Sequence, residues 1–582
     1  MTDAGPSGVP GIDIQLDPYE EDDEIPISAG DPGDSGGAQG RPSIVRSSAV
    51  MASGTAVSRI TGLVRVGALS FALGRTALSD AFNLANVAPN LIYELALGGV
   101  LSASLVPLFI ATNEAGTRPD GSTGGDDDGR SAIISVGFVA LTVLSVAAVL
   151  AATLLGGPLS HLLASTTGAD DQVRRTEFTA LAQLALPQIL LYGITTFCTA
   201  LLNARRRFAA AAYVPALNNV VSSLAFVLVG WRIGGDRSLT AMGQSDTLMI
   251  VMLGLGSTLG VLAMTFALFP AVRDAEPSLR WQFQPRHPAV RKLMQLSGWT
   301  VGYVVANQLA LVVVYAVASR SGTGTLTAYT TAFIFFQLPH GLFAVSLMTT
   351  TMPELAEASR RHDGALFQRR WLHGLRLIWL VIIPSTVGYL LVAKPLMSVL
   401  LVRGRFLAAD ADITGRTLAA FAIGLPGFSI YLYALRAFYS GQDTRTPFMI
   451  NLVENLLNII FVLSFGRSSP AMLALAFSLA YLLAAALAVW RLHERLGGLG
   501  PELGATLKMM GQVLGAAGAM AVVVWLSQLV VGGDHGGQAV VRVVLSVIVG
   551  TAAYGAAVSL LKIEGTDRIV ETVRRTVSRP RQ

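Results

Sequence analysis

Two arginines, Arg59 and Arg65, lie six residues apart inside a largely apolar run, and Asp80 follows shortly after it. A charged side chain in the hydrocarbon core of a bilayer costs several kilocalories per mole unless a polar cavity receives it. A guanidinium group stays protonated and presents a planar pair of donors to phosphate oxygens. This pattern therefore predicts a cavity for an anionic substrate that carries phosphate.

A stripe of polar side chains continues on the next apolar segment. On a helix that turns by about 100° per residue, its five members fall within an arc of about 120°. They are Asp80, Asn83, Asn86, Asn90 and Glu94. Such a stripe cannot face lipid without a large cost, so we expect it to line the same cavity as the arginines. Asp80 has a second interpretation, compatible with the first, in which it neutralises an arginine.

A second polar face occurs late in the chain, where Asn451, Glu454 and Asn455 share one side of an apolar segment. The preceding segment carries Arg436, whose neighbours on its own helical face include no acidic residue. A buried arginine needs an anion or a polar cavity. Two hypotheses remain, pairing with Glu454 or binding of the substrate phosphate in the cavity, and we favour the second.

The elements that must position these residues are membrane-spanning helices. Of the 582 residues, 52% are hydrophobic and only 14% are charged, whereas a soluble protein has about 25% charged residues. Apolar runs of about 20 residues, each long enough to span a bilayer, recur along the chain. We predict an all-α polytopic membrane protein with about 14 spans. They lie near 46–74, 78–112, 131–156, 178–203, 209–232, 246–270, 293–319, 325–354, 373–393, 413–441, 447–466, 471–490, 509–531 and 543–561.

The sequence lacks the common motifs of catalysis and cofactor binding. It has one cysteine, Cys198, and no HExxH, no CxxC pair, no Walker loop and no GxSxG. We therefore expect neither an enzyme nor a bound metal or cofactor. The net charge of +5 follows the topology of the spans, so it is not a signal for nucleic acid.

The basic residues predict the orientation in the cell membrane. With the N-terminus inside, cytoplasmic segments would hold roughly 26 Lys and Arg and the opposite loops roughly 12, as the positive-inside rule requires. Both termini are then cytoplasmic, and basic clusters such as Arg205-Arg206-Arg207 lie inside. Lipid headgroups are the membrane partners that such clusters would meet.

An internal repeat predicts two lobes. Residues 201–230 and 439–466 each contain a polar hinge, a proline, asparagines and an apolar run. A shift of six spans relates them, so the lobes should be parallel repeats with a substrate site between them, a known transporter plan. The predicted parts are an acidic, disordered cytoplasmic tail (1–45), an N-terminal lobe with helices 1–6 (46–270), a C-terminal lobe with helices 7–12 (271–500), extra helices 13–14 (501–562) and a basic cytoplasmic tail (563–582).

Several segments resemble one family. "SRITGLVR", "LSDAFNLANVAPNLIYELALGGVLSASLVPLF", "FQLPHGLFAVSLMTTTMPELA" and "DTRTP" are similar to segments of the MurJ/MviN family, lipid II flippases of the multidrug/oligosaccharidyl-lipid/polysaccharide (MOP) superfamily, and look actinobacterial in type. The resemblance implies fourteen helices and a cationic central cavity that opens alternately to each side. It matches Arg59, Arg65 and Asp80 to family motif positions.

The chain also departs from the family pattern. Tyr93 and Glu94 stand where members often have a basic pair, and "AYTTAFIFFQLP" lacks a family arginine. Asn451 and Asn455 match the helix-eleven positions of a family sodium site, whose helix-seven acid has no counterpart. We therefore expect a less cationic cavity, a candidate ion site at Asn451, Glu454 and Asn455, and coupling to sodium or to protons.

The resemblance implies a function in peptidoglycan biosynthesis, and hence in the cell wall and cell shape. We expect a flippase that moves lipid-linked peptidoglycan precursor (lipid II) by alternating access, with the cavity arginines on the diphosphate. One alternative is an exporter of another lipid-linked glycan or amphipathic compound. Another is a cell-wall scaffold with degenerate transport that recruits cytoplasmic regulators. The charges at Arg59, Arg65 and Asp80 argue against the scaffold, which needs no charge in the membrane.

Overall fold

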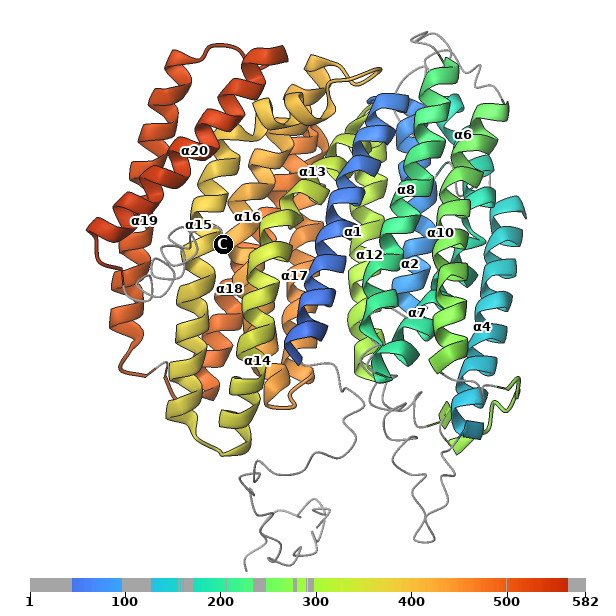
Figure 1. The fold of residues 1–582 in the computed structure, drawn as a ribbon, viewed down its shortest axis with the longest axis horizontal. Helices are drawn as coiled ribbons and strands as arrows, with labels where there is room; N and C mark the ends of the chain where they lie inside the picture. The colour runs from blue at the N-terminus through green and yellow to red at the C-terminus, as the bar shows by residue number, and fades with distance from the viewer. Residues whose placement is uncertain are drawn as a thin grey trace, which may run out of the picture.

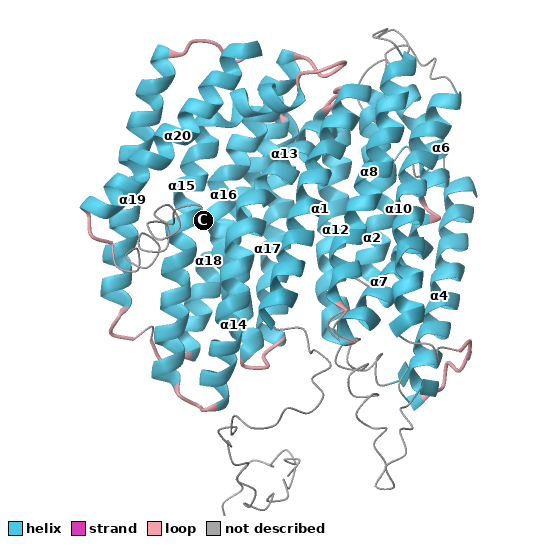
Figure 2. Ribbon diagram, in the orientation of Figure 1, coloured by secondary structure: helices cyan, strands magenta, loops and turns pink. Residues whose placement is uncertain are grey.

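The computed structural model describes residues 44–96, 127–154, 158, 161, 171–205, 207–233, 247–275, 280–288, 290–291, 298–498 and 500–563. Within these ranges every regular element is a helix (Figures 1 and 2). Most helices run roughly parallel to one another in a single wide bundle. This arrangement agrees with the predicted all-α membrane fold, because helices satisfy their backbone hydrogen bonds internally within lipid.

The first half of the chain forms the N-terminal lobe. Its helices are α1 (Ile44–Leu73), α2 (Ala77–Ala96), α4 (Asp127–Leu154), α6 (Asp171–Ala185), α7 (Gln188–Ala204), α8 (Phe208–Ile233) and α10 (Thr247–Ala275). Helices α6 and α7 together make one span, Arg175–Ala204. Pro187 separates them, because its ring cannot donate the backbone hydrogen bond that a continuous helix requires.

The second half forms the C-terminal lobe and two additional helices. The lobe contains α12 (Gly298–Arg320), α13 (Thr325–Pro339), the π-helical turn η1 (His340–Ala344), α14 (Val345–Arg360), α15 (Gly364–Leu401), α16 (Ala408–Ser440), α17 (Arg445–Ser464), the short 3-10 turn η2 (Gly466–Ser468) and α18 (Pro470–Arg495). The additional helices α19 (Leu503–Val530) and α20 (Gly536–Leu560) pack on each other and on α15.

The predicted spans correspond to the helices that the structure describes. Thirteen helices in the described ranges are long and apolar enough to cross a membrane. The remaining expected span, 78–112, begins as α2, and residues 97–112 lie outside the description. Helix α15 is much longer than its expected span of 373–393. Its 38 residues correspond to about 57 Å of helix, and the amphipathic ends escape a hydropathy window.

Helix packing repeats between the two lobes. Helix α1 packs on α8, and α12, six spans later, packs on α17. In the same way α7 packs on α10 as α16 packs on α18, and α4 packs on α7 as α15 packs on α16. The equivalent pairs confirm a parallel repeat of six spans, followed by the two extra helices.

Helix α13 belongs firmly to the C-terminal lobe. Its Phe333 and Phe336 lie 5.3–5.6 Å, between ring centroids, from Phe421 of α16 and Phe477 of α18. Each aromatic pair of this kind contributes about 0.5–1.5 kcal/mol beyond its buried area. We therefore treat α13, α16 and α18 as one rigid unit.

The lobes meet mainly where α2 contacts α12 and α13. We call the side of the bundle where α1 begins the near side, and the side where α1 ends the far side; in Figure 1 they lie at the bottom and the top. The first turn of α13 lies on the far side, close to the start of α2.

Candidate functional site

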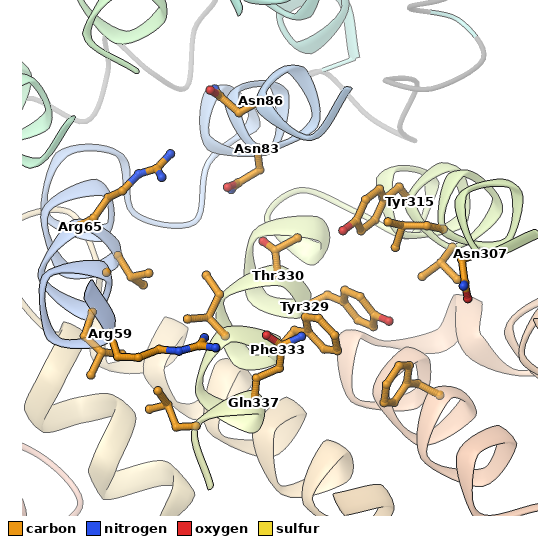
Figure 3. Close-up of a pocket in the computed structure, with 18 of the residues that line it drawn as sticks. Arg59, Arg65, Asn83, Asn86, Asn307, Tyr315, Tyr329, Thr330, Phe333 and Gln337 are labelled. Atoms are coloured by element: carbon orange, nitrogen blue, oxygen red, sulfur yellow. The ribbon is translucent and has the colours of Figure 1, made fainter. Parts of the chain in front are cut away.

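A cavity of about 920 Å³ lies between the two lobes. Helices α1, α2, α7 and α8 form one wall, and α12, α13, α17 and α18 form the other (Figure 3). Its volume is at the upper end of the range for small-molecule sites, about 300–1,000 Å³. Polar and apolar side chains both line it, so the cavity can accept a polar group together with an apolar part of the same molecule.

Arg59 and Arg65 both line the cavity from α1, and both side chains extend into it (Figure 3). Within the described part of the chain, neither guanidinium forms an ion pair or a hydrogen bond. Helix α1 is fixed by α8, because Asn219 Nδ2 donates to the Ser58 carbonyl oxygen at 3.1 Å. The two cations are thus held on a fixed wall with their donors free for an anion.

The Arg59 guanidinium lies against Gly341 of η1. A Cβ atom at Gly341 would be 3.4 Å from Arg59 Nη2 and 3.6 Å from Cζ. A Cβ at these distances would make ordinary van der Waals contact, so the Arg59 guanidinium lies one side-chain layer from the backbone of η1.

Only part of the polar stripe of α2 is seen to line the cavity. Asn83 and Asn86 line the cavity (Figure 3), and Asn83 Nδ2 donates to Thr327 Oγ1 of the other lobe at 3.2 Å. Asn90 and Glu94 lie outside the residues whose side chains are described.

Asp80 does not line the cavity; its buried carboxylate binds the first turn of α13. Oδ2 accepts a hydrogen bond from the Gly324 backbone N–H at 2.6 Å. Oδ1 accepts from the Thr327 N–H at 2.8 Å and from Thr327 Oγ1 at 2.6 Å. A carboxylate at a helix N-terminus satisfies donors that have no partner inside the helix and interacts favourably with the helix dipole. Asp80 therefore joins the two lobes on the far side.

Arg75 reinforces the same junction. Its Nε donates to the Gly324 carbonyl oxygen at 2.9 Å and its Nη2 to that of Thr323 at 3.1 Å. Its Nη1 lies 3.4 Å from Asp410 Oδ1 at the start of α16. We call Arg75, Asp80 and their partners on α13 and α16 the far-side latch. Sequence reasoning missed Arg75, because an arginine at the end of a span usually marks only the membrane boundary.

The opposite wall carries an acidic side chain and a cluster of amides. Glu454 and Asn455 line the cavity, whereas Asn451 lies behind them. Asn307 Oδ1 of α12 accepts hydrogen bonds from Asn451 Nδ2 and from Asn455 Nδ2, both at 3.1 Å. Asn455 Nδ2 also lies 3.2 Å from Asn451 Oδ1. The three candidate ion-site residues are thus adjacent in the structure.

Arg436 lies outside the lining of the cavity. Its side chain is half-buried and forms no ion pair or hydrogen bond with a described residue, Glu454 included. Arg436 and Arg59 are the two cations that act electrostatically on His340. His340 Nδ1 lies 3.0 Å from Ser429 Oγ.

Several lining residues were not predicted from the sequence. Asn307, Gln308 and Gln337 border the cavity, and Tyr192 completes the wall on α7. The adjacent pair Asn307-Gln308 in an otherwise apolar run was a usable signal. Gln337 had none, because a single glutamine gives no periodicity.

Comparison with known proteins gives one consistent family. A family model described as lipid II flippase MurJ matches residues 69–540. A probable lipid II flippase MurJ of Rhizobium meliloti (strain 1021) is 26% identical over 432 residues, which cover 74% of this chain and 76% of that protein. A lipid II flippase MurJ of Burkholderia cenocepacia is 28% identical over 423 residues, covering 71% and 77%.

Solved structures give the same fold. A lipid II flippase MurJ in an inward closed conformation superposes with a TM-score of 0.71 and 21% identity, covering 90% of this chain and all of that one. An inward-facing multidrug resistance MATE transporter of the MOP superfamily superposes with a TM-score of 0.60 and 10% identity, covering 77% and 95%. At these identities the likeness extends to the fold alone.

Proposed function

Because the chain belongs to the family of the lipid II flippase MurJ, we propose that it carries lipid II across the cell membrane by alternating access. The observation that carries this proposal is the cavity between the lobes, with two guanidinium groups that have no described partner. Transport of this kind leaves the substrate chemically unchanged, so the protein acts as a transporter and not as an enzyme.

Arg59 and Arg65 bind the diphosphate of the substrate in this proposal. Hydrogen bonds to charged groups contribute about 1.5–3 kcal/mol each, and arginine matches the geometry of phosphate oxygens. Asn83 and Asn86 offer amide groups to the same headgroup, and Asn90 and Glu94 extend the predicted stripe. Arg436 would contact the anion on its way into the cavity from the near side.

The lobes alternate between two arrangements in the proposal. The far-side latch holds them together in this conformation, so rocking must break the contacts between Asp80 and α13 to open the far side. The distribution of basic residues supports a cytoplasmic near side with both termini in the cytoplasm. The tails, 1–45 and 563–582, would then reach cytoplasmic cell-wall regulators. The group Asn451, Glu454 and Asn455 is the candidate site for a coupling ion.

The proposal is tested with purified protein in liposomes that contain fluorescent lipid II. Wild-type protein is expected to move lipid II between leaflets, and Arg59→Ala and Arg65→Ala are expected to slow this at least about tenfold, the loss of one charge-assisted contact. Arg491→Ala is the matched control, because Arg491 is exposed, lies outside the cavity lining and contacts nearby Glu494 and Trp490. Wild-type protein that moves no lipid II, or cavity variants with full activity, would contradict the proposal.

A further inference from the structure

The described lining of the cavity contains one carboxyl group, that of Glu454 on α17. The residue is 1% exposed. Its Oε2 is buried without a hydrogen-bond partner, and the side chain forms no ion pair within the described ranges. A buried carboxylate is costly unless a cation or hydrogen-bond donors compensate its charge. Glu454 therefore raises the question of which form the carboxyl takes here.

The groups that face Glu454 do not compensate a negative charge. Four tyrosines of the C-terminal lobe lie close enough to interact electrostatically with it. They are Tyr303 of α12, Tyr329 of α13, Tyr431 of α16 and Tyr481 of α18. The cations that border the same cavity, Arg59 and Arg65, lie on the opposite wall. This environment favours the neutral carboxylic acid over the ionised carboxylate.

The described cavity wall offers a metal ion one carboxyl group and neutral amide oxygens. A hard cation needs several free oxygen ligands around it. Asn307 Oδ1 already accepts two hydrogen bonds, and Asn451 Oδ1 accepts one from Asn455. The side-chain oxygens of Asn307 and Asn451 are thus engaged, whereas the buried Asn458 Oδ1 and Gln308 Oε1 of the same lining have no hydrogen-bond partner among the described residues. A metal ion would have to gather such neutral oxygens around a single carboxyl group, whereas a proton needs the carboxyl group alone.

We propose that Glu454 binds a proton in this conformation and releases it to water when the cavity opens, so that protonation favours the closed arrangement of the lobes. The inference rests on the proposed function only in requiring that the cavity opens. With Glu454 neutral, the described lining carries two positive charges, from Arg59 and Arg65, which equal the two negative charges of a diphosphate diester. Ionised Glu454 would cancel one of them, so proton binding also suits the site to its anion.

The thermodynamic linkage between proton binding and closure sets the direction of the pH dependence. A ligand shifts an equilibrium toward the state that binds it better, and here the closed state binds the proton better. The closed population should therefore be high at low pH and fall as pH rises. A single proton changes the ratio of closed to open molecules by at most about tenfold per pH unit.

The test measures the distance between the lobes without substrate. Spin labels are placed at Leu154→Cys on α4 and Ala409→Cys on α16, two exposed positions on the far side that the latch holds closed, in a Cys198→Ala background. Electron-spin measurements in nanodiscs between pH 5 and 9 give the distance between the two labels. In the otherwise wild-type protein, a short distance at low pH should be replaced by a longer one as the pH rises. Glu454→Gln should keep the short distance throughout, and Glu454→Asp should retain a pH dependence, which excludes a folding defect at this position.

Glu177→Gln is the matched control. Glu177 on α6 is 3% exposed and also lacks a hydrogen bond or ion pair with a described residue, but it does not line the cavity. This variant should behave like the wild type. A Glu454→Gln protein with an unchanged pH profile would overturn the proposal, as would an equal effect of Glu177→Gln, or opening that follows sodium concentration instead of pH. Because no lipid II is present, these outcomes are independent of the flipping assay.

Discussion

A guanidinium group keeps its charge at every pH a cell reaches, so Arg59 and Arg65 keep the cavity cationic whether or not a substrate is bound. Such charges are tolerated inside a membrane protein because a polar cavity receives them. The cavity also surrounds them with neutral amides, which can donate to phosphate oxygens without competing for the arginines. The side chains of the cavity are thus already arranged to bind an anion before the anion enters.

A substitution of Arg436 tests whether this residue contacts the substrate anion outside the cavity. We predict that Arg436→Lys lowers the initial rate of lipid II movement severalfold, because lysine lacks the planar fork that binds two phosphate oxygens. The initial rate in liposomes over a range of lipid II concentrations measures this. Arg376→Lys is the control, since Arg376 is engaged with Glu502. Unchanged transport by Arg436→Lys would assign Arg436 a structural role.

The side chains of the site were predictable where helical periodicity alone places them. Arg59, Arg65, Asn83 and Asn86 follow from one helical face each, and they line one cavity. The position of Asp80 did not follow, because its partners lie on α13, about 245 residues away in sequence, and only tertiary packing brings them together. Residues in isolated polar positions, such as Gln337, escape a periodicity argument for a related reason.

At the scale of elements, α13 connects the site to the motion of the lobes. Aromatic packing fixes it to α16 and α18, while its first turn binds Asp80 of α2. The turn η1 that follows it lies against Arg59 of α1. A π-helical turn is a frequent irregularity at functional sites, and here it brings the backbone of the C-terminal lobe to a cavity arginine.

We predict that Asp80→Asn weakens far-side closure by about 1–3 kcal/mol, because the charged acceptor for three donors is lost. Spin labels at Leu154→Cys and Ala409→Cys, exposed far-side positions on separate lobes, should report a longer mean distance. Asp412→Asn, a half-buried acid on α16 outside the latch, should leave the distance unchanged. If the Asp80→Asn protein stays fully closed on the far side, Asp80 does not hold the two lobes together.

The turn between α16 and α17 predicts a stability effect at acid pH. Burial raises the pKa of Asp443, but hydrogen bonds from Thr446 and the charge of Arg495 lower it more, so the pKa lies below its ordinary value. Arg495 Nη1 lies 2.9 Å from Asp443 Oδ2. Stabilisation by a carboxyl with a lowered pKa is present at neutral pH and is lost as pH falls through the folded-state pKa.

We therefore predict that Asp443→Asn lowers the free energy of unfolding at pH 7 by up to about 1 kcal/mol, since the pair is partly exposed. The difference from wild type should begin to shrink below about pH 4 and disappear once the pH is below the lowered folded-state pKa. Thermal unfolding in detergent between pH 3 and 7 measures it. Glu494→Gln, which breaks an exposed pair with Arg491, should show a smaller difference. A constant deficit of Asp443→Asn at all pH values would contradict the assignment.

At the scale of the whole molecule, the fold was largely predictable because its signal is spread over many residues. Thirteen described helices correspond to expected spans, and the repeat appears again in the packing of helix pairs. Helix ends were less predictable, as α15 shows. Hydropathy detects the hydrocarbon core, whereas α15 begins ahead of it with residues such as Arg369, whose Nε lies 3.0 Å from Glu502 Oε1 ahead of α19.

The N-terminal tail provides a prediction at the same scale. We expect deletion of residues 1–40 to leave lipid II movement in liposomes within about twofold of the full chain, because the segment is acidic, lacks an apolar face and precedes α1. Growth of a strain depleted of the endogenous flippase measures the cellular effect. A truncated protein that flips lipid II in liposomes but fails to support growth would assign the tail to partner binding.

The attachment of α13 to the far-side latch at one end and its approach to Arg59 just past the other have a consequence for the energy supply of the cell. Because α13 is packed as one unit with α16 and α18, a rotation that pulls its first turn away from α2 also moves η1 relative to Arg59 in the cavity. The opening of the far side is then coupled to the position of η1 beside the cavity arginine. A passage wide enough for a lipid headgroup would, if open at both ends, short-circuit the transmembrane voltage. The coupling of the far-side latch to the cavity arginine through α13 would thus help to keep the membrane sealed to ions.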